Sequence, residues 1–160
     1  MKLKVGIGYD VHQLTENRKF FLGGTEIPDS PLGALGHSDA DCLIHAVIDA
    51  LLGAANLRDI GFQYPDNKEE YKDIDSKKLL KDTFDKITAK GYSIENIDSI
   101  ICLQKPKISK FIPQMQQILA DILNLDCEDI TIKATTTEHL GFTGRSEGIS
   151  AYSVCLLKKE

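Results

Sequence analysis

The longest apolar stretch of the chain, from Cys42 to Ala55, constrains the fold more than any other segment. It is too short to span a bilayer and predicts a buried helix, which we expect over residues 39–55. His45 and Asp49 interrupt the run, and with Asp41 they lie four residues apart, on one polar stripe of that helix. A polar stripe within so much apolar surface must be satisfied by water, by protein partners or by an ion.

A second group of polar residues lies at the end of the first strand-like run, where Asp10 and His12 flank Val11. Residues two apart in an extended strand point to the same face, so these side chains can converge on one ion that a third ligand completes. Three nitrogen and oxygen ligands leave a fourth position open, as in catalytic zinc sites. For His45 two interpretations stay open: a structural histidine, or the third ligand with Asp41 or Asp49 orienting its imidazole.

The cysteines do not predict a closed structural metal site. The four cysteines lie far apart without a C-x-x-C pair: Cys42, Cys102, Cys127 and Cys155. Three of them sit in apolar runs, where a buried free thiol is the common outcome, so we expect a reducing compartment.

Composition restricts the class of protein. With 160 residues and 42% hydrophobic residues, the chain predicts one domain over residues 1–160. A net charge of −5 without a Lys/Arg cluster argues against nucleic acid as a partner. The first residues enter a strand pattern directly, with neither a signal peptide nor a transit peptide, so we expect a cytoplasmic protein without a membrane partner. A plastid protein whose leader has been removed is the other possibility.

The hydrophobic pattern predicts an α+β fold. We expect strands over residues 2–9, roughly 19–23, 97–103, 130–134 and 149–157, and further helices over 76–90 and 110–123. Ser38 or Asp39 is expected to cap the helix over 39–55, and Ser76 the helix over 76–90. This order predicts a mixed sheet with helices packed on one face. Solvent or another subunit would cover the other face, and the small and aromatic residues of 149–157 suit a subunit contact.

Three further segments leave their roles open. The threonines and glycines of 133–148 can present hydroxyls and backbone N–H groups to phosphate oxygens, or can be a strand edge running into a flexible loop. Lys105-Pro106-Lys107 is either a solvated basic turn or a nucleotide contact. Gly6 and Gly8 lack the third glycine and the following helix of a phosphate-binding loop.

Several motifs in order along the whole chain resemble one enzyme family, the 2-C-methyl-D-erythritol 2,4-cyclodiphosphate synthases of the non-mevalonate isoprenoid pathway. The matching segments are Gly8–His12, Gly36–Asp41, His45–Ala54, Asp59–Gly61, Tyr64–Asp66 and Lys133–Arg145. The resemblance implies a phosphorus–oxygen lyase that converts 4-diphosphocytidyl-2-C-methyl-D-erythritol 2-phosphate into the cyclic diphosphate and releases CMP. It also implies a cyclic homotrimer with each site between two subunits.

The resemblance further implies roles for individual residues. Asp10, His12 and His45 match the zinc ligands, while His37 and Thr136 match positions that stabilise the transition state. A second ion, Mg²⁺ or Mn²⁺, is expected on the substrate diphosphate with help from Glu138. The other substrate-binding positions are Ser38, Asp59, Ile60, Gly61, Tyr64, Pro65, Asp66, Asn67, Lys68, Leu103, Gln104, Lys105, Pro106, Lys107, Ile108, Ser109, Thr135, Thr137, Phe142 and Arg145.

Among these positions, Asp59 and Gly61 match ribose contacts, 64–68 match contacts to the erythritol part, and 103–109 match the cytosine pocket. Asn67-Lys68 and His139 depart from the residues common in the family. The competing function is a non-catalytic, zinc-containing module that binds a nucleotide or an isoprenoid diphosphate. A pure binder would not need His37, Thr136 and an open three-ligand site together.

Overall fold

A mixed five-stranded sheet forms the centre of the molecule in the computed structural model, which describes residues 1–28 and 30–160. The strand order is β4-β1-β7-β5-β6. Its members are β1 (Lys2–Thr15), β4 (Gly33–Leu35), β5 (Ser93–Cys102), β6 (Ile130–Thr135) and β7 (Gly148–Lys159). Only the β5–β6 pairing is parallel, and the other three pairings are antiparallel. A small hairpin joins β2 (Phe21–Leu22) to β3 (Thr25–Glu26).

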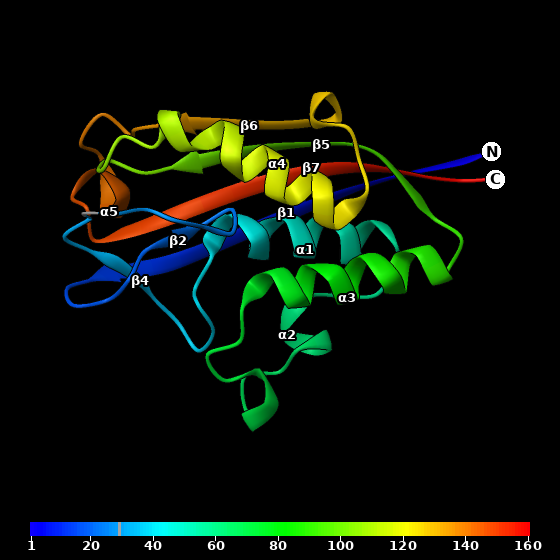
Figure 1. Cartoon of the computed structure of the whole chain (residues 1–160), viewed down its shortest axis with the longest axis horizontal. Coiled ribbons are helices and arrows are strands. Elements are labelled where there is room, and N and C mark those ends of the chain that lie inside the picture. Colours follow the sequence, from blue (N-terminus) through cyan, green and yellow to red (C-terminus); the bar gives the residue numbers. More distant parts are fainter. Residues whose placement is uncertain (29) are drawn as a thin grey trace.

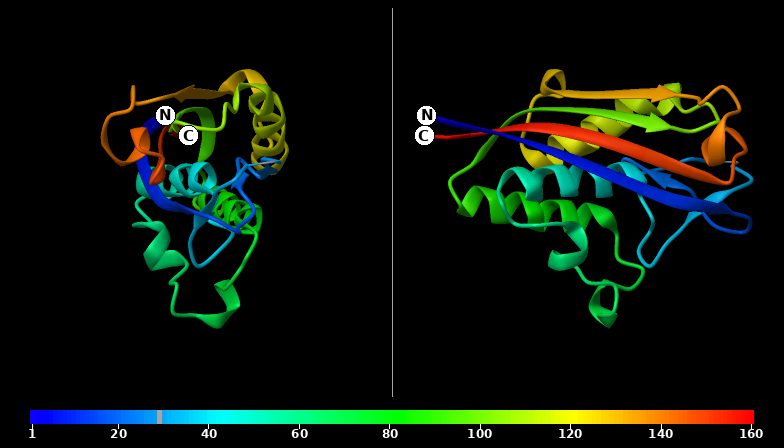
Figure 2. Two further views of the ribbon diagram at one scale, coloured as in Figure 1. Left: turned by 90° about the vertical axis from the view of Figure 1, so that its left-hand side faces the viewer. Right: turned by 180° about the vertical axis from the view of Figure 1, so that it is seen from behind.

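Three longer helices cover one side of this sheet, as the sequence predicts (Figures 1 and 2). They are α1 (Cys42–Ala54), α3 (Ser76–Ala89) and α4 (Ile112–Leu123). The short helical segments are α2 (Ile60–Gln63), α5 (Gly141–Gly144) and the 3₁₀ turns η1 (Glu69–Tyr71), η2 (Ser109–Phe111) and η3 (Cys127–Asp129). The α+β class and the mixed sheet are therefore confirmed.

Helix α1 lies directly on β1, and two glycines allow this close approach. A Cβ added at Gly6 would lie 2.0 Å from the carbonyl oxygen of Ala50, and one added at Gly8 would lie 1.9 Å from that of Ala46. Any larger residue would push the helix off the strand. The Gly-x-Gly pair thus has a packing role, and it fixes α1 against the strand that carries Asp10 and His12.

The opposite face of the sheet carries apolar side chains that no helix covers. In the single chain they include Val5 at 70% and Ile7 at 69% exposure. The other exposed apolar side chains of this face are Leu3, Tyr9 and Val11 of β1 and Tyr152 and Val154 of β7. We call these seven residues the bare apolar face. Such a contiguous apolar strip is typical of a surface that another protein covers.

Several predicted boundaries and caps are wrong. Helix α1 begins at Cys42, and its N-cap is Asp41, whose side chain accepts a hydrogen bond from the Ile44 amide. Asp75, one residue before Ser76, caps α3. The strand predicted over roughly 19–23 is a hairpin of two very short strands, and β4, α2 and α5 were missed. Elements of two to four residues carry too little hydrophobic periodicity to be recognised.

The four cysteines are free thiols, as expected from their spacing. Cys42 and Cys155 are buried, whereas Cys102 and Cys127 are half-buried. Among residues 1–28 and 30–160, no helix is both long and apolar enough to cross a membrane.

Candidate metal centre and nucleotide site

Asp10 and His12 on β1 and His45 on α1 bring three ligand atoms together. His12 Nε2 lies 2.8 Å from Asp10 Oδ2, and His45 Nδ1 lies 3.2 Å from each of these two atoms. A tetrahedral ion with bonds of about 2.0 Å separates its ligand atoms by about 3.3 Å. The donor set and the spacing therefore fit a divalent transition metal, with room for a fourth ligand.

The second nitrogen of each histidine has its own hydrogen-bond partner. His12 Nδ1 donates to the carbonyl oxygen of Leu35, 3.0 Å away on β4. His45 Nε2 lies 2.8 Å from the hydroxyl of Ser76. We call His12 Nδ1 and His45 Nε2 the outer nitrogens, because they face away from the other two ligands. These bonds hold a proton on each outer nitrogen, so the inner nitrogens, His12 Nε2 and His45 Nδ1, keep the lone pair that a metal requires.

The charges within this cluster also favour a cation. Burial acts to raise the pKa of Asp10, but hydrogen bonds and charge from His12 and His45 outweigh burial and hold that pKa below its usual range. Burial acts to lower the pKa of His12, but the hydrogen bond and charge of Asp10 raise it above the ordinary value. The carboxylate thus attracts positive charge, which a bound metal ion supplies in place of protons.

Neither remaining member of the polar stripe on α1 orients the His45 ring. The buried Asp41 carboxylate accepts from the backbone amides of Gly23, Gly24 and Ile44. Asp49 accepts from the amide of Ile60, 3.0 Å away. Asp41 therefore fixes the β2–β3 turn, and Asp49 fixes the start of α2.

A cavity of about 330 Å³ opens beside the three ligands. Predicted site residues supply most of its wall: His12, His37, Ser38, His45, Ile60, Gly61, Tyr64 and Asp66. Three wall residues were missed, Tyr71, Ile74 and Leu79. They are apolar or aromatic residues without a motif, so nothing in the local sequence separates them from ordinary core residues.

The segment from Asp59 to Lys68 is shaped by local hydrogen bonds. Asp59 caps α2 through the amide of Phe62, at 2.9 Å. The Tyr64 hydroxyl is bound to Asp82 and Thr83 on α3, at 2.7 and 2.8 Å. The Lys68 amide donates to the Pro65 carbonyl oxygen, which closes a turn with Asn67 exposed. Helix α3 thereby holds the floor of the cavity.

A second hollow, of about 190 Å³, lies at the other predicted half of the site. Its wall combines the loop after β5 with the end of β6: Leu103, Gln104, Pro106, Lys107, Ile108, Ser109, Ala134, Thr135 and Thr136. The amide of Leu103 donates to the carbonyl oxygen of Thr135 at 2.9 Å, which ties the two segments together. Lys105 lines a neighbouring depression with His139.

The threonine segment is exposed and bonds mainly to itself. The Thr136 hydroxyl donates to Glu138 Oε1 at 2.9 Å, and that of Thr137 donates to the Leu140 carbonyl oxygen at 2.7 Å. Glu138 and His139 have φ values of 51° and 63°, in the left-handed region that few non-glycine residues occupy. Consecutive residues of this kind are concentrated at functional sites.

Phe142 and Arg145 lie on and just after α5, and neither residue lines either hollow. The exposed guanidinium of Arg145 makes two hydrogen bonds to Glu147, at 2.8 and 3.0 Å. This pairing raises the pKa of Arg145 and lowers that of Glu147.

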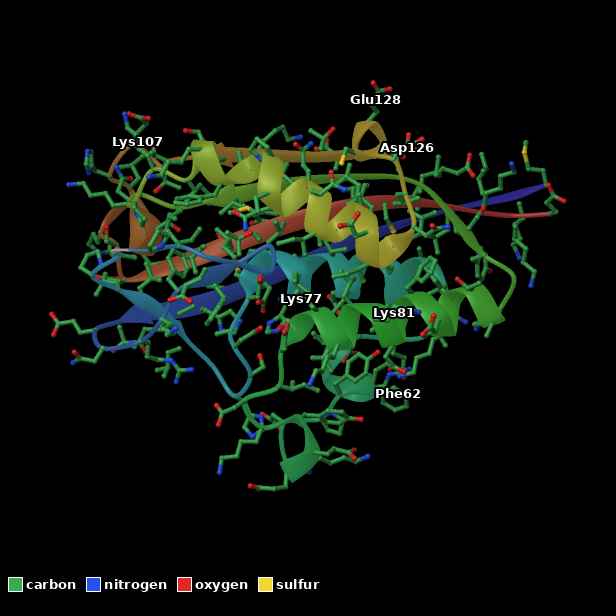
Figure 3. All side chains as sticks on the ribbon, viewed as in Figure 1. Phe62, Lys77, Lys81, Lys107, Asp126 and Glu128 are labelled. Carbon is green, nitrogen blue, oxygen red and sulfur yellow. The ribbon has the colours of Figure 1, made fainter. Side chains whose placement is uncertain are left out.

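The two halves of the predicted site are separate within one chain. Lys107 of the second hollow lies at the upper left of Figure 3, over the end of the sheet where β5 and β6 stop. His12 of β1 pairs with Ile149 of β7, and Cys102 of β5 pairs with Ser150 of β7, so both halves lie at the same end of the sheet, on either side of β7. The two hollows nevertheless have no wall residue in common, and neither the 103–109 loop nor Thr136 lines the cavity beside the metal ligands.

Comparison with known proteins identifies the family. The model of the YgbB family matches residues 3–158. The chain belongs to the YgbB family. A 2-C-methyl-D-erythritol 2,4-cyclodiphosphate synthase of Bacteroides fragilis is 60% identical over 159 residues, 99% of both chains. The synthase of Clostridium acetobutylicum is 59% identical over 155 residues, 97% of this chain and 99% of the relative.

Solved structures place the fold in the same group. A bifunctional IspDF from Campylobacter jejuni superposes with a TM-score of 0.95 at 43% identity, with 99% of this chain covering 43% of that longer protein. A CDP complex of IspF from Plasmodium falciparum gives a TM-score of 0.86 at 32% identity, covering 99% and 97% of the two chains. The family resemblance predicted from the motifs of this YgbB-family chain is therefore confirmed.

Proposed function

We propose that this protein is a metal-dependent 2-C-methyl-D-erythritol 2,4-cyclodiphosphate synthase. It converts 4-diphosphocytidyl-2-C-methyl-D-erythritol 2-phosphate into the cyclic diphosphate and releases CMP, a step of the non-mevalonate isoprenoid pathway. The observation that carries the proposal is the open set of three ligands, Asp10, His12 and His45, beside the cavity that His37 and Ser38 line. Relatives that share about 60% of the sequence over its full length are named for this reaction.

The nucleophile of this reaction is the substrate's own 2-phosphate, which is an anion at neutral pH. One of its oxygens forms a bond to the diphosphate phosphorus that carries the erythritol part. The bond from that phosphorus to the oxygen shared with CMP breaks, and CMP leaves with the electron pair. No strong general base is needed, so the protein has to fold a polyanion back on itself and stabilise the charge on the reacting phosphate.

Side chains of the chain perform these tasks. Asp10, His12 and His45 would hold Zn²⁺ or another divalent transition metal, which would supply positive charge beside the reacting phosphates. His37 is exposed beside the cavity, where its ring stabilises the reacting phosphate together with the Thr136 hydroxyl. Glu138, hydrogen-bonded to Thr136, helps to hold Mg²⁺ or Mn²⁺ on the diphosphate.

The remaining residues bind the rest of the substrate. Asp59, Ile60 and Gly61 contact the ribose, and residues 64–68 contact the erythritol part. The 103–109 loop with Thr135 and Thr137 holds the cytidine diphosphate. Phe142 and Arg145 are the other two substrate-binding residues. The wall of the hollow of about 190 Å³ at that loop combines apolar side chains with polar ones, the mixture typical of a small-molecule site; the apolar members are Leu103, Pro106, Ile108 and Ala134, and the polar members are Gln104, Lys107, Ser109, Thr135 and Thr136.

A cyclic homotrimer unites the two halves of the site. The metal ligands and Asp59 come from one subunit, and the 103–109 loop and the threonines come from the next. Two observations support this arrangement: the two hollows have no wall residue in common within one chain, and the bare apolar face of β1 and β7 offers a surface for a neighbour. Sedimentation of the native protein at the mass of three chains tests it.

The decisive experiment incubates the protein with substrate, Zn²⁺ and Mg²⁺ and measures CMP. We expect CMP and the cyclic diphosphate in equal amounts, with none from His45→Ala. A metal-loaded trimer that binds CDP but releases no CMP would instead identify the non-catalytic binding module.

A further inference from the structure

The outer nitrogen of His45 faces two hydroxyl groups at different distances. Ser76 Oγ lies 2.8 Å from Nε2, and Ser38 Oγ lies 3.2 Å from it. The Ser38 hydroxyl also accepts from the Ala40 amide at 3.2 Å. Ser76 is fully buried, so its hydroxyl can bond only to protein groups.

The Ser76 hydroxyl is bound on its far side to a carboxylate. Asp39 Oδ1 lies 2.5 Å from Ser76 Oγ, and Asp39 Oδ2 accepts from the Ser76 amide at 2.8 Å. The Asp41 amide donates to Asp39 Oδ1 as well, at 3.2 Å. Three donors thus fix the Asp39 carboxylate, which leaves the Ser76 hydroxyl as donor to Asp39 and acceptor from His45.

We propose that Ser76 and Asp39 are positioning residues for the metal ligand His45. This inference rests on the proposed function, because it assumes that His45 binds the metal through Nδ1. The Asp39 carboxylate polarises the Ser76 hydroxyl, and the hydroxyl accepts the Nε2 proton. The chain fixes the ring orientation and makes Nδ1 a better electron donor.

The same contacts join parts of the site that are distant in sequence. His45 lies in α1, Ser76 is the first residue of α3, and Asp39 lies in the loop before α1. Helix α3 also holds the cavity floor through the Tyr64 hydroxyl. Removal of the Ser76 hydroxyl should therefore loosen the metal ligand without opening the substrate cavity.

Metal affinity of the folded protein, without substrate, tests the proposal. Zn²⁺ affinity is measured by competition with a chromophoric chelator in wild type, Ser76→Ala and Asp39→Asn. We expect Ser76→Ala to weaken binding by roughly 10- to 100-fold, the range for lost outer partners of metal ligands. Asp39→Asn keeps the shape and the Ser76 hydroxyl but removes the charge, so we expect a smaller, several-fold loss.

Two controls separate positioning from general damage. Ser99→Ala removes another buried hydroxyl, one whose hydrogen-bond partner is Ser153 and not a candidate metal ligand, and should leave the affinity unchanged. The absorption spectrum of bound Co²⁺ should change in Ser76→Ala and Asp39→Asn, because the geometry and donor strength at His45 change. It should not change in Ser99→Ala.

The outcomes are distinct for this inference and for the proposed function. Wild-type Zn²⁺ affinity and an unaltered Co²⁺ spectrum in either folded variant, Ser76→Ala or Asp39→Asn, would overturn the positioning role. A loss in Ser38→Ala equal to that expected for Ser76→Ala, with Ser76→Ala unchanged, would assign the role to Ser38. A wild-type protein that binds no Zn²⁺ at all would overturn the metal site itself, and with it the proposed function.

Discussion

The two halves of the site differ in how far one chain organises them. In the metal half, β1 and α1 pack tightly, and each histidine has a fixed partner on its outer nitrogen. In the nucleotide half, the threonines are largely exposed, and Thr136 and Thr137 bond to neighbours within their own loop. A buried half built on regular elements is organised before any ligand arrives, whereas the exposed half would gain its contacts from the substrate and from the second subunit of the proposed trimer.

The two faces of the sheet repeat this contrast. The face under α1 is filled so closely that Gly6 and Gly8 admit no side chain. The other face displays Val5 and Ile7 without a cover from the same chain. The single chain thus completes its core and brings the three candidate metal ligands together, and in the proposed trimer a neighbouring subunit would complete the nucleotide half.

Loss of a metal ligand should have the largest effect. His45→Ala removes one of three donors from the organised half, so we expect loss of bound zinc and no detectable CMP release. Circular dichroism should show a folded protein, since the core of α1 remains. Zinc retained at the wild-type level in this variant would contradict the ligand assignment.

A charge on the bare apolar face should be nearly as damaging. Ile7→Glu places a carboxylate where 69% of the side chain is exposed in the single chain, so folding should survive. Burial of that charge between subunits is unfavourable, and we expect monomers and a nearly complete loss of activity. Sedimentation and metal analysis should report a monomer that still binds zinc. An active trimer would remove this face from the interface.

Removal of one hydroxyl from the exposed half should give an intermediate effect. Thr136→Val keeps the shape but removes a donor for the reacting diphosphate, and we expect kcat to fall roughly 10²-fold with a smaller change in KM. Thr136 is exposed, so the melting temperature should hardly change. A change confined to KM would make Thr136 a binding residue.

Mixing two inactive variants should restore part of the activity. His45→Ala breaks the metal half, and Lys105→Glu with Lys107→Glu breaks the cytidine half. Refolded together in equal amounts, they should form intact sites at about a quarter of positions, because each site draws its halves from two neighbours. Activity near that fraction is the expected result. If verified mixed trimers recover no activity, each subunit builds its own site.

The smallest effect is expected from thiol modification. Burial raises the pKa of the Cys155 thiol to about 11, so at pH 8 only about one in 10³ is ionised. We expect iodoacetamide to label the half-buried Cys127 in the native protein and to spare Cys42 and Cys155, with activity unchanged. Peptide mapping gives the pattern, and urea should expose the spared thiols. Rapid native labelling of Cys155 would contradict the packing of β7 on the helices.

Local spacing in the sequence determined much of this protein. The alternation of a strand places Asp10 and His12 on one face, and the period of a helix places His45 among apolar neighbours. Spacing therefore made His45 a candidate third ligand but left a structural role open, and only the family resemblance implied the full ligand set. The three longer helices and the long strands carry enough periodicity to be found, although β1 ends at Thr15 and not at the predicted residue 9.

Only the tertiary structure decided which partners those residues meet. Ser76 reads as a helix cap, yet Asp75 performs that role and the Ser76 hydroxyl meets His45, 31 residues away. Asp41 and Asp49 look like orienting carboxylates, yet they hold the β2–β3 turn and α2. Hydrogen bonds of this kind depend on how separate elements pack against one another. The hydrophobic periodicity of a single segment does not determine that packing.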